Sequence, residues 1–233
     1  VTGGAGYIGS HVVRQLGEAG HRVVTLDNLS TGFRDAVLYG DLVEGDTGDE
    51  ALVRDTLDRY AVDTVMHFAA HTIVPESVAD PLKYYGNNTC NTRNLLECCI
   101  DAGVRHFVFS STAAVYGIPE ADQCWEDTPT QPINPYGMSK LMSEHMLRDL
   151  GAASDLRYVI LRYFNVAGSD PEGRIGQSTP GNCASCHSGT FDTLHTNHGH
   201  TVALGGSDLS GGTSCGSCHA VANWTEIDTK HNV

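Results

Sequence analysis

Three glycines spaced three residues apart, Gly3, Gly6 and Gly9, limit the possible folds more than any other feature of the chain. They follow Val1-Thr2, which is typical of the end of a β-strand, and they precede a helix expected from Gly9 to Gly17. Glycines permit a tight turn and a close backbone approach to a ligand, and a helix N-terminus offers unpaired N–H groups and a positive dipole end. The run therefore predicts a loop that cradles the pyrophosphate of a dinucleotide.

Strand and helix patterns alternate up to about residue 170. Apolar and β-branched runs predict further strands at 22–26, 41–45, 64–68, 106–110 and 157–162. Helices are expected at 49–59, 81–102 and 136–150. Strands that alternate with helices of this length imply an α/β fold with a doubly wound, Rossmann-like parallel sheet.

Asp27 ends the second expected strand, 18 residues after Gly9. A carboxylate at this point can hydrogen-bond both hydroxyls of an adenosine ribose. It would repel a 2′-phosphate, so the sequence favours NAD over NADP as the cofactor.

Tyr136 and Lys140 lie four residues apart, on one face of an expected helix. A neighbouring ammonium favours the phenolate, so we expect the pKa of Tyr136 to fall from about 10 toward neutrality. Tyr136 would then act as a general base. Thr112 closes the expected strand 106–110 and is placed to relay the proton or to hold a substrate hydroxyl.

Many separate stretches of residues 1 to about 180 match one family. They include VTGGAGYIGSH, LDNLSTG, VPESVADPLKYYGNN, FVFSSTAAVYG, NPYGMSKLMSEHML and LRYFNVAGSDPEGRIGQSTP. With them the chain resembles the UDP-glucose 4-epimerases, which belong to the extended short-chain dehydrogenase/reductase family. The resemblance implies an isomerase that interconverts UDP-glucose and UDP-galactose by transient oxidation at C4, with NAD as a recycled cofactor. It also implies a UDP-sugar substrate, a homodimer and a cytoplasmic location.

The resemblance assigns roles to individual residues. Residues that would hold the pyrophosphate are Gly3, Gly6, Tyr7, Ile8 and Gly9. Those that would contact the adenosine are Asp27, Asn28 and Asp46. Those that would line the rest of the cofactor cleft are Phe68, Ala69, Ala70, Asn87, Tyr163 and Phe164. Asn165 would reach the sugar nucleotide, and Thr112, Tyr136 and Lys140 would be catalytic. Thr72 stands where the family often has a lysine that contacts the cofactor, which would weaken NAD retention.

The family pattern stops near Gln177-Ser-Thr-Pro180. In the family, the following region supplies most of the uridine-binding part, so we expect this chain to bind NAD weakly and to have little epimerase activity. Another sugar-nucleotide enzyme of the extended family, such as a decarboxylase or a dehydratase, is an alternative. Against a dehydratase, Ala113-Ala114 follow Thr112 in place of the usual acidic pair.

Composition changes abruptly near Pro180-Gly181, which predicts an epimerase-like domain at 1–180 and a separate tail at 181–233. The tail is rich in Gly, Ser, Thr and His, and it cannot bury enough apolar surface to fold without a cofactor. It holds two Cys-x-x-Cys-His motifs, formed by Cys183, Cys186 and His187 and by Cys215, Cys218 and His219. In such motifs two thiols can attach to haem vinyl groups and the histidine can ligate the iron.

The tail thus resembles a fragment of a multihaem c-type cytochrome carrying two haems. Second iron ligands could come from His195, His198, His200 or His231. A four-cysteine zinc site and a tail without function are alternatives, although zinc would not explain the histidine after each pair. A two-haem electron-transfer protein with the first domain as passenger is the alternative reading of the whole chain. Haem attachment would require the periplasm, whereas the epimerase-like domain implies the cytoplasm. A junction of two unrelated coding pieces is the simplest explanation of this conflict.

A formal charge of −14 argues against nucleic acid and anionic membranes as partners. No run approaches the roughly 20 apolar residues of a membrane span. The spacing of Cys90, Cys98, Cys99 and Cys124 suggests no disulfide framework, and we expect buried or half-buried thiols. Because Val1 lies within an expected strand, we also expect that the natural protein begins further upstream.

Overall fold

The computed structural model describes residues 1–119 and 123–176. The chain divides into two compact units, Val1–Val166 and Ala167–Val233. In the described part of the second unit, Ser169 and Gly176 form an antiparallel bridge, and Arg174 Nε lies 3.0 Å from a carboxylate oxygen of Asp170.

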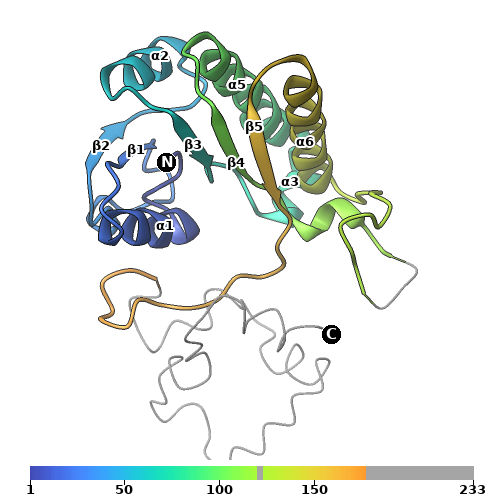
Figure 1. Cartoon of the computed structure of the whole chain (residues 1–233). Coiled ribbons are helices and arrows are strands. Elements are labelled where there is room, and N and C mark those ends of the chain that lie inside the picture. Colours follow the sequence, from blue (N-terminus) through green and yellow to red (C-terminus); the bar gives the residue numbers. More distant parts are fainter. Residues whose placement is uncertain (120–122, 177–233) are drawn as a thin grey trace, which may run out of the picture. The chain divides into compact units, whose positions relative to one another are not determined.

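The first unit is built on a parallel sheet (Figure 1). Strand β1 (Val24–Asp27) pairs with β2 (Asp41–Glu44). Strand β4 (His106–Ser110) lies between β3 (Thr64–His67) and β5 (Arg157–Leu161). All of these pairings are parallel, as the sequence predicts for a Rossmann-like α/β fold.

Thr2 joins the two groups of strands. It forms parallel bridges to Leu26 of β1 and to His67 of β3. Its N–H donates to Met66 O at 3.0 Å, and Phe68 N–H donates to Thr2 O at 2.9 Å. The spatial order is therefore β2, β1, Thr2, β3, β4, β5.

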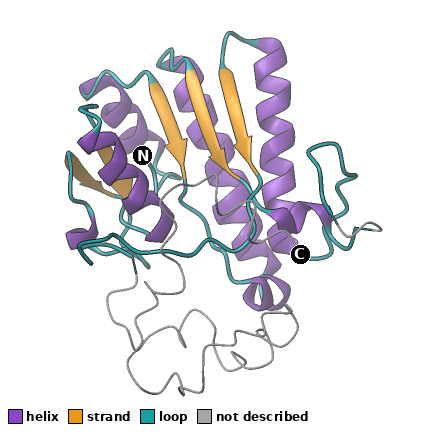
Figure 2. Ribbon diagram, turned by 60° about the horizontal axis from the view of Figure 1, so that its bottom comes forward, coloured by secondary structure: helices purple, strands orange, loops and turns teal. Residues whose placement is uncertain are grey.

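Helices cover both faces of the sheet (Figures 1 and 2). One face carries α2 (Glu50–Arg59), α5 (Asn91–Asp101) and α6 (Pro135–Ala153), and α1 (Tyr7–Glu18) packs on the other. Short 3-10 turns occur at η1 (Arg34–Ala36) and η3 (Ala113–Tyr116).

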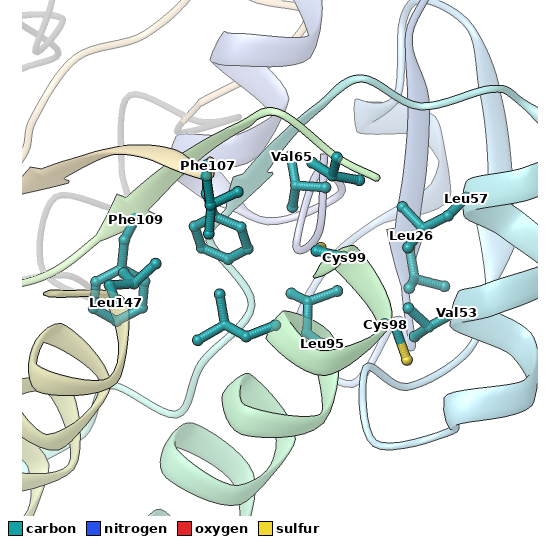
Figure 3. Packing of buried hydrophobic residues seen from close by; sticks show 13 residues of the cluster. Leu26, Val53, Leu57, Val65, Leu95, Cys98, Cys99, Phe107, Phe109 and Leu147 are labelled. Carbon is teal, nitrogen blue, oxygen red and sulfur yellow. The ribbon is translucent and has the colours of Figure 1, made fainter. Parts of the chain in front are cut away.

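The core lies between the sheet and the three helices on one face (Figure 3). Phe107 and Phe109 point from β4 toward these helices, and Leu95 and Cys99, four residues apart on α5, meet them. Leu147 of α6 is fully buried beside them. Burying one such side chain contributes about 1.5–3 kcal/mol to folding. This packed layer therefore holds the strands in place, and in such sheets ligands bind at the carboxyl ends of the strands.

The start of α6 is set by its first residues. Asn134 is the N-cap, and its Oδ1 accepts the Gly137 N–H at 2.8 Å. Pro135 follows at the first helical position, where its missing N–H costs nothing. This cap places Tyr136 in the first turn of the helix.

The helix expected at 81–102 is interrupted. The chain forms α3 (Val74–Ala79), which the sequence analysis missed, then α4 (Pro81–Tyr84), a π-helical turn η2 (Tyr85–Cys90) and α5. A π turn inserts one extra residue and shifts the side chains that follow. Because helical periodicity continues on both sides of it, the sequence pattern did not reveal it.

Candidate active site

The glycine loop is held by contacts that exclude a side chain. Gly3 has a φ of +68°, and a Cβ there would lie 2.5 Å from Ala69 N. At Gly9 a Cβ would lie 2.1 Å from Gly3 O. The two positions therefore require glycine for different reasons, the first for the turn and for closeness to the segment after β3, the second for close packing of α1 on the loop.

Helix α1 begins directly after this loop. Gly6 is its N-cap, and no acidic side chain stands in the first turn. The positive end of the helix dipole thus lies at the loop, and an anion bound there would be stabilised. Gly9 is buried, Ile8 is half-buried and the Tyr7 side chain is 37% exposed.

Asp27 is a buried carboxylate that ties the loop to the end of β1. Its Oδ2 accepts the Ala5 N–H at 2.9 Å, and its Oδ1 accepts the Leu29 N–H at 2.8 Å. Leu29 has a φ of +56°, which is unusual for a branched residue and marks local strain. Each carboxylate oxygen has a second lone pair, so Asp27 keeps the capacity to accept from ligand hydroxyls.

Asp46, just after β2, accepts hydrogen bonds from residues of three segments. Asn28 Nδ2 donates to Asp46 Oδ2 at 2.8 Å. The other oxygen, Oδ1, accepts from Gly48 N at 2.8 Å and from Asn91 Nδ2 at 2.9 Å. The segments after β1 and β2 and the start of α5 are therefore fixed to one another.

A cleft opens at the carboxyl ends of β1, β2 and β3. Residues expected from the sequence that line it are Gly3, Gly6, Asp27, Asn28, Asp46, Phe68, Ala69, Ala70 and Asn87. Residues that the sequence analysis missed are Leu26, Ser30, Thr31, Gly45, Thr47 and His71. Each of the missed residues lies beside or close to an expected one, so the rule that ligands bind at strand carboxyl ends was the available signal. Tyr7, Ile8 and Gly9 do not line the cleft, and Thr72 is exposed outside it.

Tyr136 and Thr112 meet at the end of β4. Tyr136 is half-buried in the first turn of α6, and its phenol interacts with the Thr112 side chain. The ring of Tyr84 packs edge-on against it, with centroids 6.4 Å apart. Burial raises the pKa of Tyr136, and the interaction with Thr112 partly opposes that rise.

Lys140 does not act on Tyr136 as expected. Its side chain is buried, its Nζ donates to the Ser110 carbonyl at 2.9 Å, and it lies 4.9 Å from the centroid of the Phe109 ring. Burial lowers the pKa of Lys140 to about 7. The expected lowering of the Tyr136 pKa is therefore wrong for this structure, because the ammonium faces β4 and burial dominates at the phenol.

Asn88 connects the cleft to α6. This residue of the π turn is buried, and its Oδ1 accepts the His71 N–H at 2.8 Å while its Nδ2 donates to His71 O at 2.9 Å. The same Nδ2 lies 3.1 Å from Ser139 Oγ, between Tyr136 and Lys140 on α6. The extra residue of the π turn thus places an amide where it holds the loop after β3 against α6.

Of the three residues after β5 that the sequence assigns to the site, Tyr163 contacts the end of β4 and the other two are exposed. The hydroxyl of Tyr163 is hydrogen-bonded to that of Ser110. The side chain of Phe164 is 69% exposed, and Asn165 is exposed. None of the three lines the cleft, so their assigned contacts with nicotinamide and sugar stay predictions.

The described residues contain no group of three or more His, Cys, Asp or Glu side chains that could hold a metal ion. Among them, Cys98 and Cys99 are buried, Cys124 is half-buried and Cys90 is exposed, and all four are free thiols. Cys90, the last residue of the π turn, departs from the expected burial. No helix in the part of the chain that the structure describes is long and apolar enough for a membrane span. The predicted haem ligands, the tail and the boundary near Pro180 lie outside the described residues.

A family model described as "NAD dependent epimerase/dehydratase family" matches residues 1–202. The chain is 60% identical over 181 residues to a UDP-glucose 4-epimerase of Azospirillum brasilense, a match that covers 77% of this chain and 52% of that protein. The chain therefore spans about half the length of the curated relatives it matches.

Solved structures give a similar result. A UDP-glucose 4-epimerase from Brucella ovis in complex with NAD matches with a TM-score of 0.74 and 48% identity, over 75% of this chain and 54% of that one. A UDP-glucose 4-epimerase from Bifidobacterium longum in complex with NAD+ and UDP matches with a TM-score of 0.72 and 38% identity, over 75% and 55% of the two chains.

Proposed function

The chain belongs to the NAD dependent epimerase/dehydratase family, and we propose that it carries the cofactor-binding and proton-transfer part of a UDP-glucose 4-epimerase. The observation that carries this proposal is the cleft at the strand ends, where the glycine loop, buried Asp27 and Asp46 converge. Through Asn88 this cleft is tied to the helix that bears Tyr136.

The residues of the cleft fit NAD. Gly3 and Gly6 line the cleft, and α1 begins directly after Gly6, so the backbone N–H groups at the helix N-terminus can face a pyrophosphate. Asp27 retains lone pairs for ribose hydroxyls and repels a 2′-phosphate. When bound, NAD would supply the hydride acceptor and donor for the sugar C4.

Tyr136 would move the proton of the reaction. As the phenolate it would take the proton of the sugar 4-hydroxyl while C4 loses hydride, and as the resulting phenol it would return that proton to the 4-keto oxygen when hydride comes back to the opposite face. Thr112, whose side chain interacts with the phenol, would accept from or donate to the same sugar oxygen. Lys140 would hold the end of β4 through the Ser110 carbonyl.

Binding and turnover test this proposal separately. Calorimetric titration of the 233-residue chain should show that NAD binds at least about tenfold more tightly than NADP, because a buried carboxylate opposes the extra phosphate. Tyr136→Phe should keep the NAD affinity and abolish conversion of UDP-galactose. Tyr158→Phe, which removes a phenol from β5 outside the site, is the matched control. Equal affinity for NAD and NADP, or undiminished turnover in Tyr136→Phe, would refute the assignment.

The same assay tests the expected impairment of this chain. We expect the chain to convert UDP-galactose more than about tenfold more slowly than an intact relative, since a missing binding subsite costs transition-state stabilisation. A rate within that factor would contradict the expectation.

The two Cys-x-x-Cys-His motifs support a second proposal, that residues 181–233 attach two c-type haems. It rests on the motifs alone. A visible spectrum of the chain produced with a haem-attachment system should show a Soret band with sharp α-bands on reduction. Retention of zinc with no haem after such production would favour the four-cysteine zinc site instead.

A further inference from the structure

Glu144 is a buried carboxylate on the face of α6 that carries Tyr136 and Lys140. The three residues are spaced by four along the helix, and the Glu144 side chain is fully buried. An isolated carboxylate in such a position would be strongly destabilising. Burial opposes its ionisation, but hydrogen bonds from Arg162, Ser111 and Arg148 outweigh that effect and lower the pKa of Glu144.

The hydrogen bonds of Glu144 reach the ends of two strands. Its Oε1 accepts from Ser111 Oγ at 2.5 Å, just after β4. Arg162, which follows β5, donates to the same oxygen from Nε at 2.9 Å and to Oε2 from Nη2 at 2.6 Å. Arg148, one turn further along α6, donates to Oε2 at 2.9 Å.

Both strand-end partners are direct neighbours of site residues. Ser111 precedes Thr112, and Arg162 precedes Tyr163. The guanidinium of Arg162 also stacks on Tyr116, 4.9 Å from the ring centroid. One carboxylate therefore joins the helix that bears Tyr136 to the segments that bear Thr112 and Tyr163.

A buried ion pair of this kind is weak evidence for a stabilising role, because desolvation offsets much of the attraction between the charges. A bidentate guanidinium–carboxylate contact does fix geometry, since two parallel hydrogen bonds restrict both distance and orientation. The arrangement is therefore better suited to hold three segments in register than to add stability.

We propose that Glu144 is a positioning residue, which sets the placement of the Thr112 side chain against the Tyr136 phenol by clamping the ends of β4 and β5 to α6. The proposal rests on the proposed function of Tyr136 and Thr112. It predicts that weakening the clamp changes the phenol of Tyr136 although no group touching that phenol is altered.

The phenol can be observed without turnover. In the full 233-residue chain labelled with 3-fluorotyrosine, whose phenol is more acidic than that of tyrosine, 19F NMR follows each ring through a pH titration. The Tyr136 resonance is the one absent from Tyr136→Phe. Tyr84 and Tyr163 are titratable neighbours. Burial is the main cause of the raised pKa of each, and the Tyr136 charge adds to it, so both rings report on the same cluster.

Ser111→Ala removes only the hydroxyl that links the clamp to β4, and Glu144→Gln removes the charge. Both should shift the Tyr136 resonance and raise its pKa by at least about half a pH unit, because part of the stabilisation that the Thr112 side chain gives the charged form is lost. Arg148→Met is the matched control. It removes a guanidinium from the same carboxylate, but one on α6 itself, and should leave the resonance in place.

The possible outcomes distinguish a failure of the positioning role from a failure of the proposed function. If Glu144→Gln fails to fold, Ser111→Ala carries the test alone. An unchanged Tyr136 resonance in Ser111→Ala, or an equal shift in Arg148→Met, would overturn the positioning role. Failure of the wild-type chain to bind NAD would instead count against the proposed function, because the 19F titration needs no cofactor.

Discussion

Lys140 places an ammonium group against a carbonyl and an aromatic ring inside the protein. The Ser110 carbonyl and the Phe109 ring replace only part of the hydration that the charge loses, and burial lowers its pKa to about 7. Sites of function commonly retain such unfavourable groups, because the surrounding fold supplies the stability. At the scale of single residues, a buried side chain of the candidate site is thus also a source of instability.

Replacing this group should stabilise the protein. The folded pKa of Lys140 lies below the unfolded value of about 10.4, so the unfolded state binds the extra proton between pH 7 and that value. Below pH 7 the full cost of burying the charge is present, and it is relieved as the pH rises. Lys140→Met should therefore raise the free energy of unfolding at pH 6.5, by up to about 4 kcal/mol, and the gain should shrink toward pH 9.5.

Urea unfolding at the two pH values measures this difference. Lys83→Met is the control, since the exposed Lys83 ammonium pairs with Glu76 at 2.6 Å on the surface. A gain in Lys140→Met that does not decrease with pH would show that packing, and not charge burial, is responsible.

At the scale of elements, α1 is positioned by the absence of side chains. Its first turn contacts the backbone of the glycine loop so closely that a Cβ at Gly9 would overlap the Gly3 carbonyl. Because backbone cannot move aside as a flexible side chain can, the helix must shift to admit even a methyl group. That shift would move the helix N-terminus away from the loop that it completes.

Gly9→Ala should destabilise the protein by about 3 kcal/mol and abolish NAD binding, since overpacking against backbone is costly. Gly86→Ala offers a matched control in another helical segment, because a Cβ at Gly86 meets nothing within 4 Å. That substitution should be neutral or stabilise by about 0.5–1 kcal/mol. Thermal unfolding and a NAD titration of both variants compare them, and similar behaviour of the two would contradict the close packing of α1.

At the scale of the whole described sheet, two groups of strands meet through Thr2, and His67 secures the junction. His67 Nδ1 lies 2.6 Å from Thr2 Oγ1 and Nε2 lies 2.9 Å from Thr92 Oγ1. Thr92 donates its own proton to Asn88 O, so its oxygen accepts from Nε2–H and leaves Nδ1 to accept from Thr2. The ring is therefore neutral, and burial lowers the pKa of His67 to about 3.

This junction should weaken in acid. Between about pH 6.5 and pH 3 the unfolded state binds a proton at His67 that the folded state does not, so stability falls as the pH falls. The contribution of this residue to the slope is about 1.4 kcal/mol per pH unit. His67→Gln should reduce the slope of unfolding free energy against pH below 6.5, whereas His106→Gln, at the exposed start of β4, should change it less. Equal slopes in wild type and His67→Gln, from urea unfolding at pH 6.5, 5.5 and 4.5, would exclude a neutral His67.

Local sequence patterns predicted helices and strands well where a single signal, such as an apolar run, dominates. The apolar run 106–110 matches β4 in both bounds, because a buried parallel strand must be apolar on both faces. The glycine spacing and Asp27 predicted the cleft, since both follow from backbone geometry near one strand end. The family match likewise confirms the family resemblance that the motifs of residues 1 to about 180 indicated.

Other features depend on residues that are distant in sequence. The inward amide of Asn88 requires a π turn, the direction of Lys140 depends on β4, and the Glu144 clamp needs β4, β5 and α6 together. The sequence by itself determined the order of strands and helices, the glycine loop and the candidate reactive residues, because each is indicated by a short local pattern or motif. Only the tertiary structure decided the partners and the pKa values of Tyr136, Lys140 and Glu144, because burial and hydrogen bonding depend on which segments meet in space.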